Sequence, residues 1–177
     1  MNMNFCARRF NLYLLVFCVA VASGCVGHKK KTEKVAGLRI HVESPVTLPE
    51  KYRTITVLRS QPVSVTISED PALTEANLIA AKLIETPGGF AVRLQFDETG
   101  AWMLEQATAS NPGKHLALFG QWGDKISDGR WLAAPLITRR IADGKLTLTP
   151  DASREETERF VEGLNNTAKL IHSGPVK

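Results

Sequence analysis

The chain has 177 residues, of which 44% are hydrophobic, 23% charged and 7% aromatic. This is the composition of an ordinary globular protein, and it excludes the collagen-like, low-complexity and acidic disordered classes. Three cysteines are too few for a scaffold held together by disulfides. A single apolar run near the N-terminus argues against a protein that crosses a membrane many times.

Residues 1–24 have the pattern of a secretory signal peptide. Arg8 and Arg9 give a positive start, and the uncharged run 10–22 would form about 20 Å of helix, shorter than a hydrocarbon core of about 30 Å. Small residues then precede Cys25, and this segment resembles the lipobox of bacterial lipoproteins. The resemblance implies cleavage before Cys25 and lipid attachment to its thiol. The alternative is an ordinary signal peptide whose removal leaves a free thiol.

The same resemblance predicts where the mature chain lies. Acyl chains on Cys25 would hold it permanently at a membrane, with residues 25–37 as a lipidated, flexible tether. Val26 follows the cysteine, where an Asp retains well-studied Gram-negative lipoproteins in the inner membrane. We therefore expect a lipid-anchored protein on the periplasmic face of the envelope, at the outer membrane more than the inner.

The net charge of +4 comes from the leader and the tether. Setting aside Arg8, Arg9 and the four lysines of residues 28–34 reduces the 22 basic residues to 16, while the acidic residues fall from 18 to 17. The remaining domain is close to neutral. Nucleic-acid binding needs clustered cations that release counterions from phosphates, so no nucleic-acid partner is expected.

Residues 38–172 read as one domain that begins with strands. Apolar and polar residues alternate in the first strand, which is the period of a half-buried strand. A turn at Asp70 and Pro71 precedes one helical turn at 73–77, and a Pro-Gly-Gly turn at 86–89 predicts a hairpin. The predicted strands of this half are 38–43, 54–58, 63–67, 79–85 and 90–96. Ala80 and Ala81 leave a helix as the alternative for 79–85.

The second half adds two helices. Asp97 caps the first, whose apolar stripe includes Leu104 and which stops at Asn111. Ser153 and Glu156 form a capping box for the second, opened by Pro150 and Asp151. The predicted apolar face of that helix is Phe160, Val161, Leu164, Ala168 and Ile171.

Short strands lie between these helices. They are predicted at 116–119 and 146–148, and residues 131–141 are predicted as largely extended, with Pro135 marking an edge strand or a bulge. Residues 123–130 form a polar loop, and 173–177 a frayed tail. About seven strands and two principal helices without strict alternation predict an α+β fold, a single compact domain with a mostly antiparallel sheet.

Several short motifs follow one another between Leu73 and Leu164, among them Phe96 to Ala101 and then Asn111 with Gly113 and Lys114. In their order and spacing they resemble the periplasmic head subdomain of SecD, a subunit of the protein-export translocase. The resemblance covers residues 73–164. Its central part is a strand that runs into a helix and on to an Asn-x-Gly-Lys stop. The residues that carry it are Leu73 to Ala76, Phe96 to Ala101, Thr108, Asn111, Gly113, Lys114, Leu116 to Leu118, Ala133 to Ile137, Ile141 to Gly144, Glu155, Glu156 and Leu164.

The resemblance implies the fold of the SecD head and contact with extended polypeptide. The resemblance does not extend to energy coupling. SecD couples export to proton flow through charged residues in transmembrane helices, and no such helix is predicted in this sequence. Residues 123–130 look like an insertion relative to the family pattern.

No catalytic, metal or cofactor site is predicted. The four histidines, His28, His41, His115 and His172, lack metal-ligand spacing. Asp97 sits at a helix start, where capping explains it better than acid–base chemistry. Asp124 and Asp128 in the polar loop leave a hydrolase with an unfamiliar site as a remote alternative.

Five residues are predicted as a candidate interaction surface: Trp122, Arg130, Trp131, Arg139 and Arg140. The two tryptophans bracket the polar loop, so they either pair across a hairpin in the core or leave one ring exposed as an anchor for a partner. Arg139 and Arg140 on an edge strand would protect it from unwanted pairing, or an edge near Pro135 would accept an extended peptide.

Taken together, these patterns predict a non-enzymatic, lipid-anchored envelope protein that binds protein or unfolded peptide and is linked to protein export. The alternative is a structural lipoprotein within a larger envelope complex.

Overall fold

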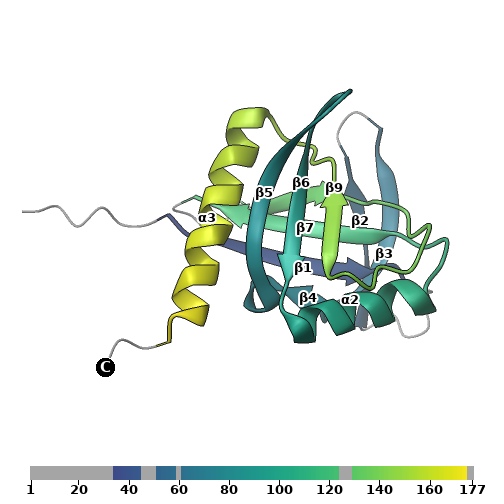
Figure 1. The fold of residues 1–177 in the computed structure, drawn as a ribbon. Helices are drawn as coiled ribbons and strands as arrows, with labels where there is room; N and C mark the ends of the chain where they lie inside the picture. The colour runs from purple at the N-terminus through teal and green to yellow at the C-terminus, as the bar shows by residue number, and fades with distance from the viewer. Residues whose placement is uncertain (1–33, 45–50, 59–60, 124–128, 175–177) are drawn as a thin grey trace, which may run out of the picture. The chain divides into compact units, whose positions relative to one another are not determined.

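The computed structural model describes residues 34–44, 51–58, 61–123 and 129–174, all within the unit of the chain that spans residues 33–177. Nine strands and two α-helices lie in these segments, as predicted for an α+β fold (Figure 1). The strands are β1 (Ala36–Val42), β2 (Tyr52–Val57), β3 (Val63–Ser68), β4 (Leu73–Thr74), β5 (Leu78–Thr86), β6 (Gly89–Phe96), β7 (Leu116–Trp122), β8 (Gly129–Ala133) and β9 (Lys145–Leu148). The helices are α2 (Glu98–Ser110) and α3 (Arg154–His172), with a short 3-10 helix, η2 (Glu75–Asn77).

The strands form three antiparallel sheets. The first has the order β4-β1-β7-β8, the second is the hairpin β2-β3, and the third has the order β5-β6-β9. Figure 1 shows β1 and β7 running across the direction of β5, β6 and β9. The four-stranded sheet contributes to two cores, because successive side chains of a strand point to opposite faces.

The larger core joins the four-stranded sheet to the β5-β6-β9 sheet. It takes Leu38 and Ile40 from β1, Leu104 from α2, and Phe160 and Leu164 from α3. Ala117 of β7 instead joins the smaller core under the β2-β3 hairpin, which also contains Val57, Val65 and Ile67. Fully burying one such aliphatic side chain is worth about 1.5–3 kcal/mol.

Local sequence signals fix the ends of the helices. The Asp97 side chain accepts a 2.6 Å hydrogen bond from the Gly100 N–H and caps α2. Ser153 and Glu156 form the predicted capping box of α3. The apolar face of α3 differs from the prediction at its end, because Ile171 is 44% exposed while Thr157 and Gly163 are buried.

The helical turn near residue 75 begins later than predicted. Thr74, and not the Asp70 turn, caps η2. Leu73 and Thr74 are held as a strand because Leu73 is fully buried and pairs with Ile40 of β1. Long-range pairing therefore overrides the local turn signal.

The predicted extended segment 131–141 is also revised. Strand β8 starts at Gly129 and ends at Ala133, so Gly129 and Arg130 belong to a strand and not to the polar loop. Pro135 lacks the N–H that a regular ladder needs, yet its carbonyl accepts a 2.9 Å hydrogen bond from Leu116 N–H. Arg139 and Arg140 lie beyond the strand.

The ordered fold begins earlier than the predicted tether boundary at residue 37. Strand β1 starts at Ala36, and the Lys34 carbonyl already accepts a hydrogen bond from the Asn166 side chain of α3. The predicted leader, Cys25, Val26, Asp124 and Asp128 lie outside the described residues.

Candidate functional site

The five residues predicted as an interaction surface do not form one surface, although two of them, Arg130 and Trp131, line the same cavity of about 630 Å³. Trp122 packs against the larger core and Trp131 against the smaller one. The prediction that they pair across a hairpin is wrong, because Trp131 is opposite Phe119 in the β7-β8 ladder. Both rings are only partly buried, but the most exposed tryptophan is Trp102 of α2, at 62%. The residues three and four positions away from Trp102 in α2 are polar, so no apolar pattern marked this ring: they are Glu98, Thr99, Glu105 and Gln106.

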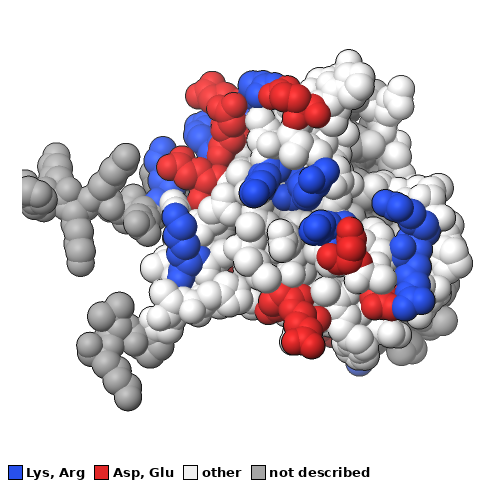
Figure 2. Space-filling model, viewed as in Figure 1, with Lys and Arg blue, Asp and Glu red and all other residues white. Residues whose placement is uncertain are grey.

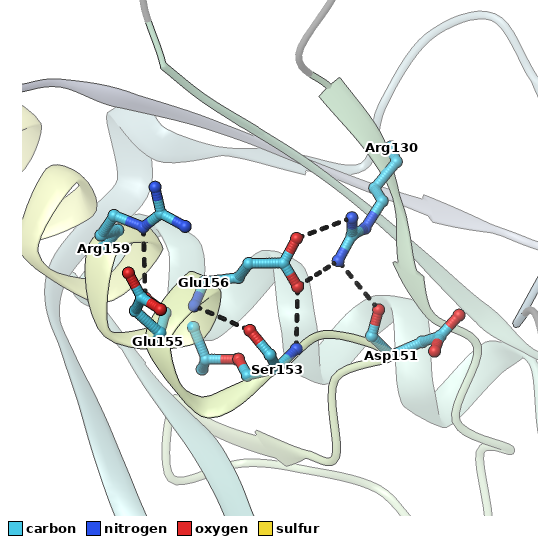
Figure 3. Close-up of polar contacts among 7 residues, drawn as sticks. Arg130, Asp151, Ser153, Glu155, Glu156 and Arg159 are labelled. Atoms are coloured by element: carbon cyan, nitrogen blue, oxygen red, sulfur yellow. Dashed lines mark hydrogen bonds and ion pairs between the residues drawn. The ribbon is translucent and has the colours of Figure 1, made fainter.

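Arg130 is engaged with the start of α3 (Figure 3). The Arg130 guanidinium donates to both Glu156 oxygens at 3.1 and 2.9 Å and to the Asp151 carbonyl at 3.2 Å. It also lies 5.2 Å from the centroid of the Trp122 ring. These contacts join β8 to the first turn of α3, so Arg130 positions the helix and is not a free anchor.

The charge state of Glu156 depends on the same contacts. Hydrogen bonds from the Arg130 guanidinium, and then from the Ser153 backbone, lower the pKa of Glu156 from 4.5 to about 2. The carboxylate is therefore ionised over the ordinary pH range, and the pair is charge-assisted.

Trp131 lies on the other side of the four-stranded sheet. Its ring meets Phe119 and His41 edge-on, with centroids 5.3 and 5.6 Å apart, and the Arg53 guanidinium lies 5.9 Å from its centroid. Burial, followed by the charges of Arg53 and Arg39, lowers the pKa of His41 despite its contact with the Ser68 carbonyl. His41 is therefore a neutral core residue near pH 7.

Arg139 and Arg140 occupy a third place. Arg140 forms an ion pair with Glu105 of α2, whereas Arg139 is exposed and borders a cavity of about 170 Å³. This cavity lies between β9 and the segment 135–141. Its lining residues are Thr108, Leu116, Pro135, Leu136, Ile137, Thr138, Arg139, Ile141, Lys145, Leu146 and Thr147.

The wall formed by residues 135–141 is fixed at both ends. Ile137 N–H donates to the Lys114 carbonyl at 2.8 Å, and Gly113 N–H donates to the Ile137 carbonyl at 2.9 Å. At the other end, Ile141 N–H donates to the buried Thr108 hydroxyl at 2.9 Å. The cavity is therefore preformed by the fold.

The opposite wall is the outer edge of β9. The Phe96 N–H donates a hydrogen bond to the Gly144 carbonyl, so Phe96 and Gly144 form a hydrogen-bonded pair. Along an antiparallel ladder, opposite residues alternate between hydrogen-bonded and non-hydrogen-bonded pairs. Leu146 and Leu148 thus exchange hydrogen bonds with β6, while the N–H and C=O of Thr147 point away from it. On that side, Thr147 has no backbone partner within the described segments.

The other outer strand of this sheet is closed by α3. The Asn165 side chain accepts from the Ala81 N–H at 2.8 Å and donates to the Ala81 carbonyl at 2.9 Å. Further along, the His172 ring contacts the Leu78 carbonyl at 2.9 Å. The asparagine thus replaces a neighbouring strand. Asn165 was not predicted, because an asparagine within a helix gives no indication of which backbone it meets.

The described residues contain no group of three or more His, Cys, Asp or Glu side chains placed to hold a metal ion. Glu43 contacts the His115 ring at 2.7 Å, and hydrogen bonds from His115 lower the Glu43 pKa against the opposing effect of burial. Because the Glu43 carboxylate also accepts from the His115 backbone N–H, the pair joins the start of β7 to the end of β1.

No helix in the described ranges is long and apolar enough to cross a membrane.

These features define an α+β domain whose β5-β6-β9 sheet has one outer edge covered by α3 and another, at β9, that borders a preformed cavity. Residues 51–168 match the family described as SecDF, P1 head subdomain, and the chain belongs to that family. No curated protein sequence matches it.

Two solved structures that are similar to this chain show the same fold. One is described as "Structure and function of a membrane component SecDF that enhances protein export" and another as "Crystal structure of SecDF in Super-membrane-facing form". Each is 22% identical over 75% of this chain, with a TM-score of 0.52. The matches span 63% and 19% of those chains. A SecDF from Thermus thermophilus matches 89% of this chain and 34% of its own, at 19% identity and a TM-score of 0.41.

Proposed function

We propose that this chain is a lipid-anchored, non-enzymatic protein of the cell envelope whose head domain binds extended polypeptide in support of protein export. Membership of the SecDF P1 head subdomain family supports the link to export, since a similar structure is described as a component that enhances protein export. The match covers only part of those chains. For this chain we therefore propose only the contribution of the head domain to export, which is contact with the exported polypeptide.

The observation that carries the proposal is the open edge of β9 beside a preformed cavity. An extended peptide binds such an edge by strand addition, in which backbone hydrogen bonds supply affinity and alternate side chains enter pockets. The outward N–H and C=O of Thr147 offer the backbone contacts. A peptide residue opposite Leu146 would point toward Leu116 and Ile137, which line the cavity. The edge predicted near Pro135 is itself paired with the start of β7, so the binding edge is assigned to β9.

Thr147→Pro tests this assignment. Proline removes the outward N–H but leaves the ladder with β6 intact, and proline is tolerated where an edge N–H faces outward. Thr147→Val is the matched control, because it removes the hydroxyl and keeps the N–H. We expect labelled unfolded polypeptide to bind residues 26–177 and the valine variant, and to bind the proline variant at least about tenfold more weakly.

Circular dichroism would establish that both variants fold. Absence of polypeptide binding to the unmodified domain, or equal binding to both folded variants, would contradict the proposal.

The proposal of a lipid anchor is based on the sequence around Cys25. Acylation there would place the domain on the periplasmic face of a membrane, and Val26 in the sorting position favours the outer membrane. Mass spectrometry of the purified chain would detect cleavage before Cys25 and the added acyl mass. Cys25→Ser should release the protein from membrane fractions, and density fractionation decides between the two membranes. An intact leader without lipid would contradict the anchor.

A further inference from the structure

The exposed face of the β5-β6-β9 sheet carries a row of cations. Lys82 of β5 lies opposite Arg93 of β6, and Lys145 of β9 lies opposite Gln95. All three cations are exposed. Within the described ranges none of them is in an ion pair, whereas Arg130, Arg140 and Arg154 are. Figure 2 shows several basic side chains, with acidic ones beside them, on the surface that lies over β5, β6 and β9 in the view of Figure 1.

The cations border the open edge of β9. The Arg93 Nε lies 3.4 Å from the Thr147 hydroxyl, which places the guanidinium across the strand whose edge is free. Lys145 is part of β9 and lines the cavity, and Arg139 lines it from the opposite wall. Asp143 accepts from the Lys145 N–H at 3.1 Å and adds a negative charge at the start of β9. The face remains net positive.

We infer that the open β9 edge selects extended polypeptides in which acidic residues alternate with apolar ones. This inference rests on the proposed function and specifies its substrate. Residues opposite one another in a ladder point to the same face of the sheet. A peptide residue opposite Lys145 or Thr147 therefore points toward the cations, and one opposite Leu146 points into the cavity. An acidic side chain opposite Lys145 or Thr147 and an apolar side chain opposite Leu146 would therefore complement this edge.

An extended polypeptide explains more of the site than an anionic membrane does. Lipid headgroups would use the cations but neither the outward backbone groups of Thr147 nor the cavity between Leu146 and Ile137. A strand uses all three features together. Anionic lipid is therefore the competing occupant in the test.

The test uses residues 26–177 and three labelled peptides that share the same alternate apolar residues, with Glu, Gln or Lys between them. Fluorescence anisotropy should show the Glu peptide binding about tenfold more tightly than the Gln peptide, and the Lys peptide more weakly still, if two or three exposed charge pairs form. Raising the salt concentration to about 0.5 M should remove most of the preference, since it shortens the Debye length.

Arg93→Gln combined with Lys145→Gln should reduce the preference to about twofold or less. The matched control combines Lys51→Gln, just before β2, with Lys169→Gln in α3. It also removes two exposed cations and should leave the preference unchanged. Equal binding of all three peptides would overturn the inference and leave the proposed function standing. Binding of none would overturn both.

Vesicles of phosphatidylcholine containing phosphatidylglycerol provide the last comparison. Little or no displacement of the Glu peptide by these vesicles supports a polypeptide partner. Vesicles that displace it completely, and whose binding depends on Arg93 and Lys145, would assign the cationic face to lipid and overturn the inference.

Discussion

Strands β5 and β9 are the two outer strands of one three-stranded sheet, but α3 covers the edge of only β5. There, Asn165 takes both backbone groups of Ala81, and α3 reaches β1 as well, since the Thr167 hydroxyl contacts the Ala36 N–H at 3.1 Å and its carbonyl at 2.8 Å. At β9 the outward groups of Thr147 face a cavity. An exposed strand edge invites pairing with other chains, and this domain protects one edge while leaving the other accessible.

The largest expected effect comes from opening the closed edge. Asn165→Ala removes the partners of a backbone N–H and C=O at Ala81, which is 2% exposed. Buried polar groups without a hydrogen-bond partner are costly, so we expect urea unfolding to show that the free energy of unfolding falls by about 2–3 kcal/mol. Asn166→Ala is the control, because it loses one exposed hydrogen bond to the Lys34 carbonyl. Equal losses in both variants would show that α3 does not protect the edge through Asn165.

Gly163→Ala tests how closely α3 approaches β1. Alanine in place of glycine ordinarily stabilises a helix by about 1 kcal/mol. Here the new Cβ would lie 2.8 Å from the Ala36 Cβ and 3.1 Å from its backbone nitrogen. We expect a destabilisation of about 1–2 kcal/mol instead. Gly88→Ala, where a Cβ meets nothing within 4 Å, should be close to neutral, and a stabilised Gly163→Ala would contradict the contact.

The start of α3 gives a pH-dependent prediction. The folded pKa of Glu156 is about 2, below its ordinary 4.5. A lowered pKa means that the unfolded state binds more protons, so this stabilisation is complete above pH 4.5 and is lost as pH falls from 4.5 toward 2. Glu156→Gln should cost about 1 kcal/mol near neutral pH, because the pair is partly exposed. The difference from wild type should shrink below pH 4.5.

Glu155→Gln controls for the general loss of an acidic residue in the first turn of α3. Its effect should be a few tenths of a kcal/mol. The pKa of His41 is depressed in the folded state. As pH falls below 6.5, protonation of His41 in the unfolded state therefore lowers the free energy of unfolding of wild type, Glu156→Gln and Glu155→Gln alike. Comparing the three proteins at the same pH cancels that contribution. A constant difference between Glu156→Gln and wild type across the acid range would contradict the ion pair.

The smallest stability effect is expected at the open edge. Thr147→Pro removes no ladder hydrogen bond to β6, so we expect a loss below about 1 kcal/mol in urea unfolding, alongside the large loss of polypeptide binding proposed above. A loss comparable to that of Asn165→Ala would mean that the Thr147 N–H has a structural partner. The contrast between the two edges would then disappear.

Much of the fold was accessible from local sequence signals. The strand period of β1, the Pro-Gly-Gly turn between β5 and β6, Asp97 and the Ser153–Glu156 capping box each act through near neighbours. The structure confirms the strand, the hairpin and both helix starts. The half-buried pattern of β1 is wrong at His41, which is 2% exposed and packs against the Trp131 ring. Where distant pairing competes with a local signal, the prediction was wrong. Leu73 is held by β1, and β8 begins at Gly129 because it pairs with β7.

The sequence alone determined the fold class, the family resemblance and most helix and strand positions, because capping, turn chemistry and side-chain periodicity depend on residues a few positions apart. Only the tertiary structure decided that Trp122 and Trp131 lie on opposite faces, that Arg130 is bound to Glu156, and that Asn165 closes one sheet edge while Thr147 is left at the other. These outcomes depend on which strands become neighbours. Outside a tight hairpin such as β5-β6, strand pairing joins residues far apart in the chain, and no local pattern specifies it.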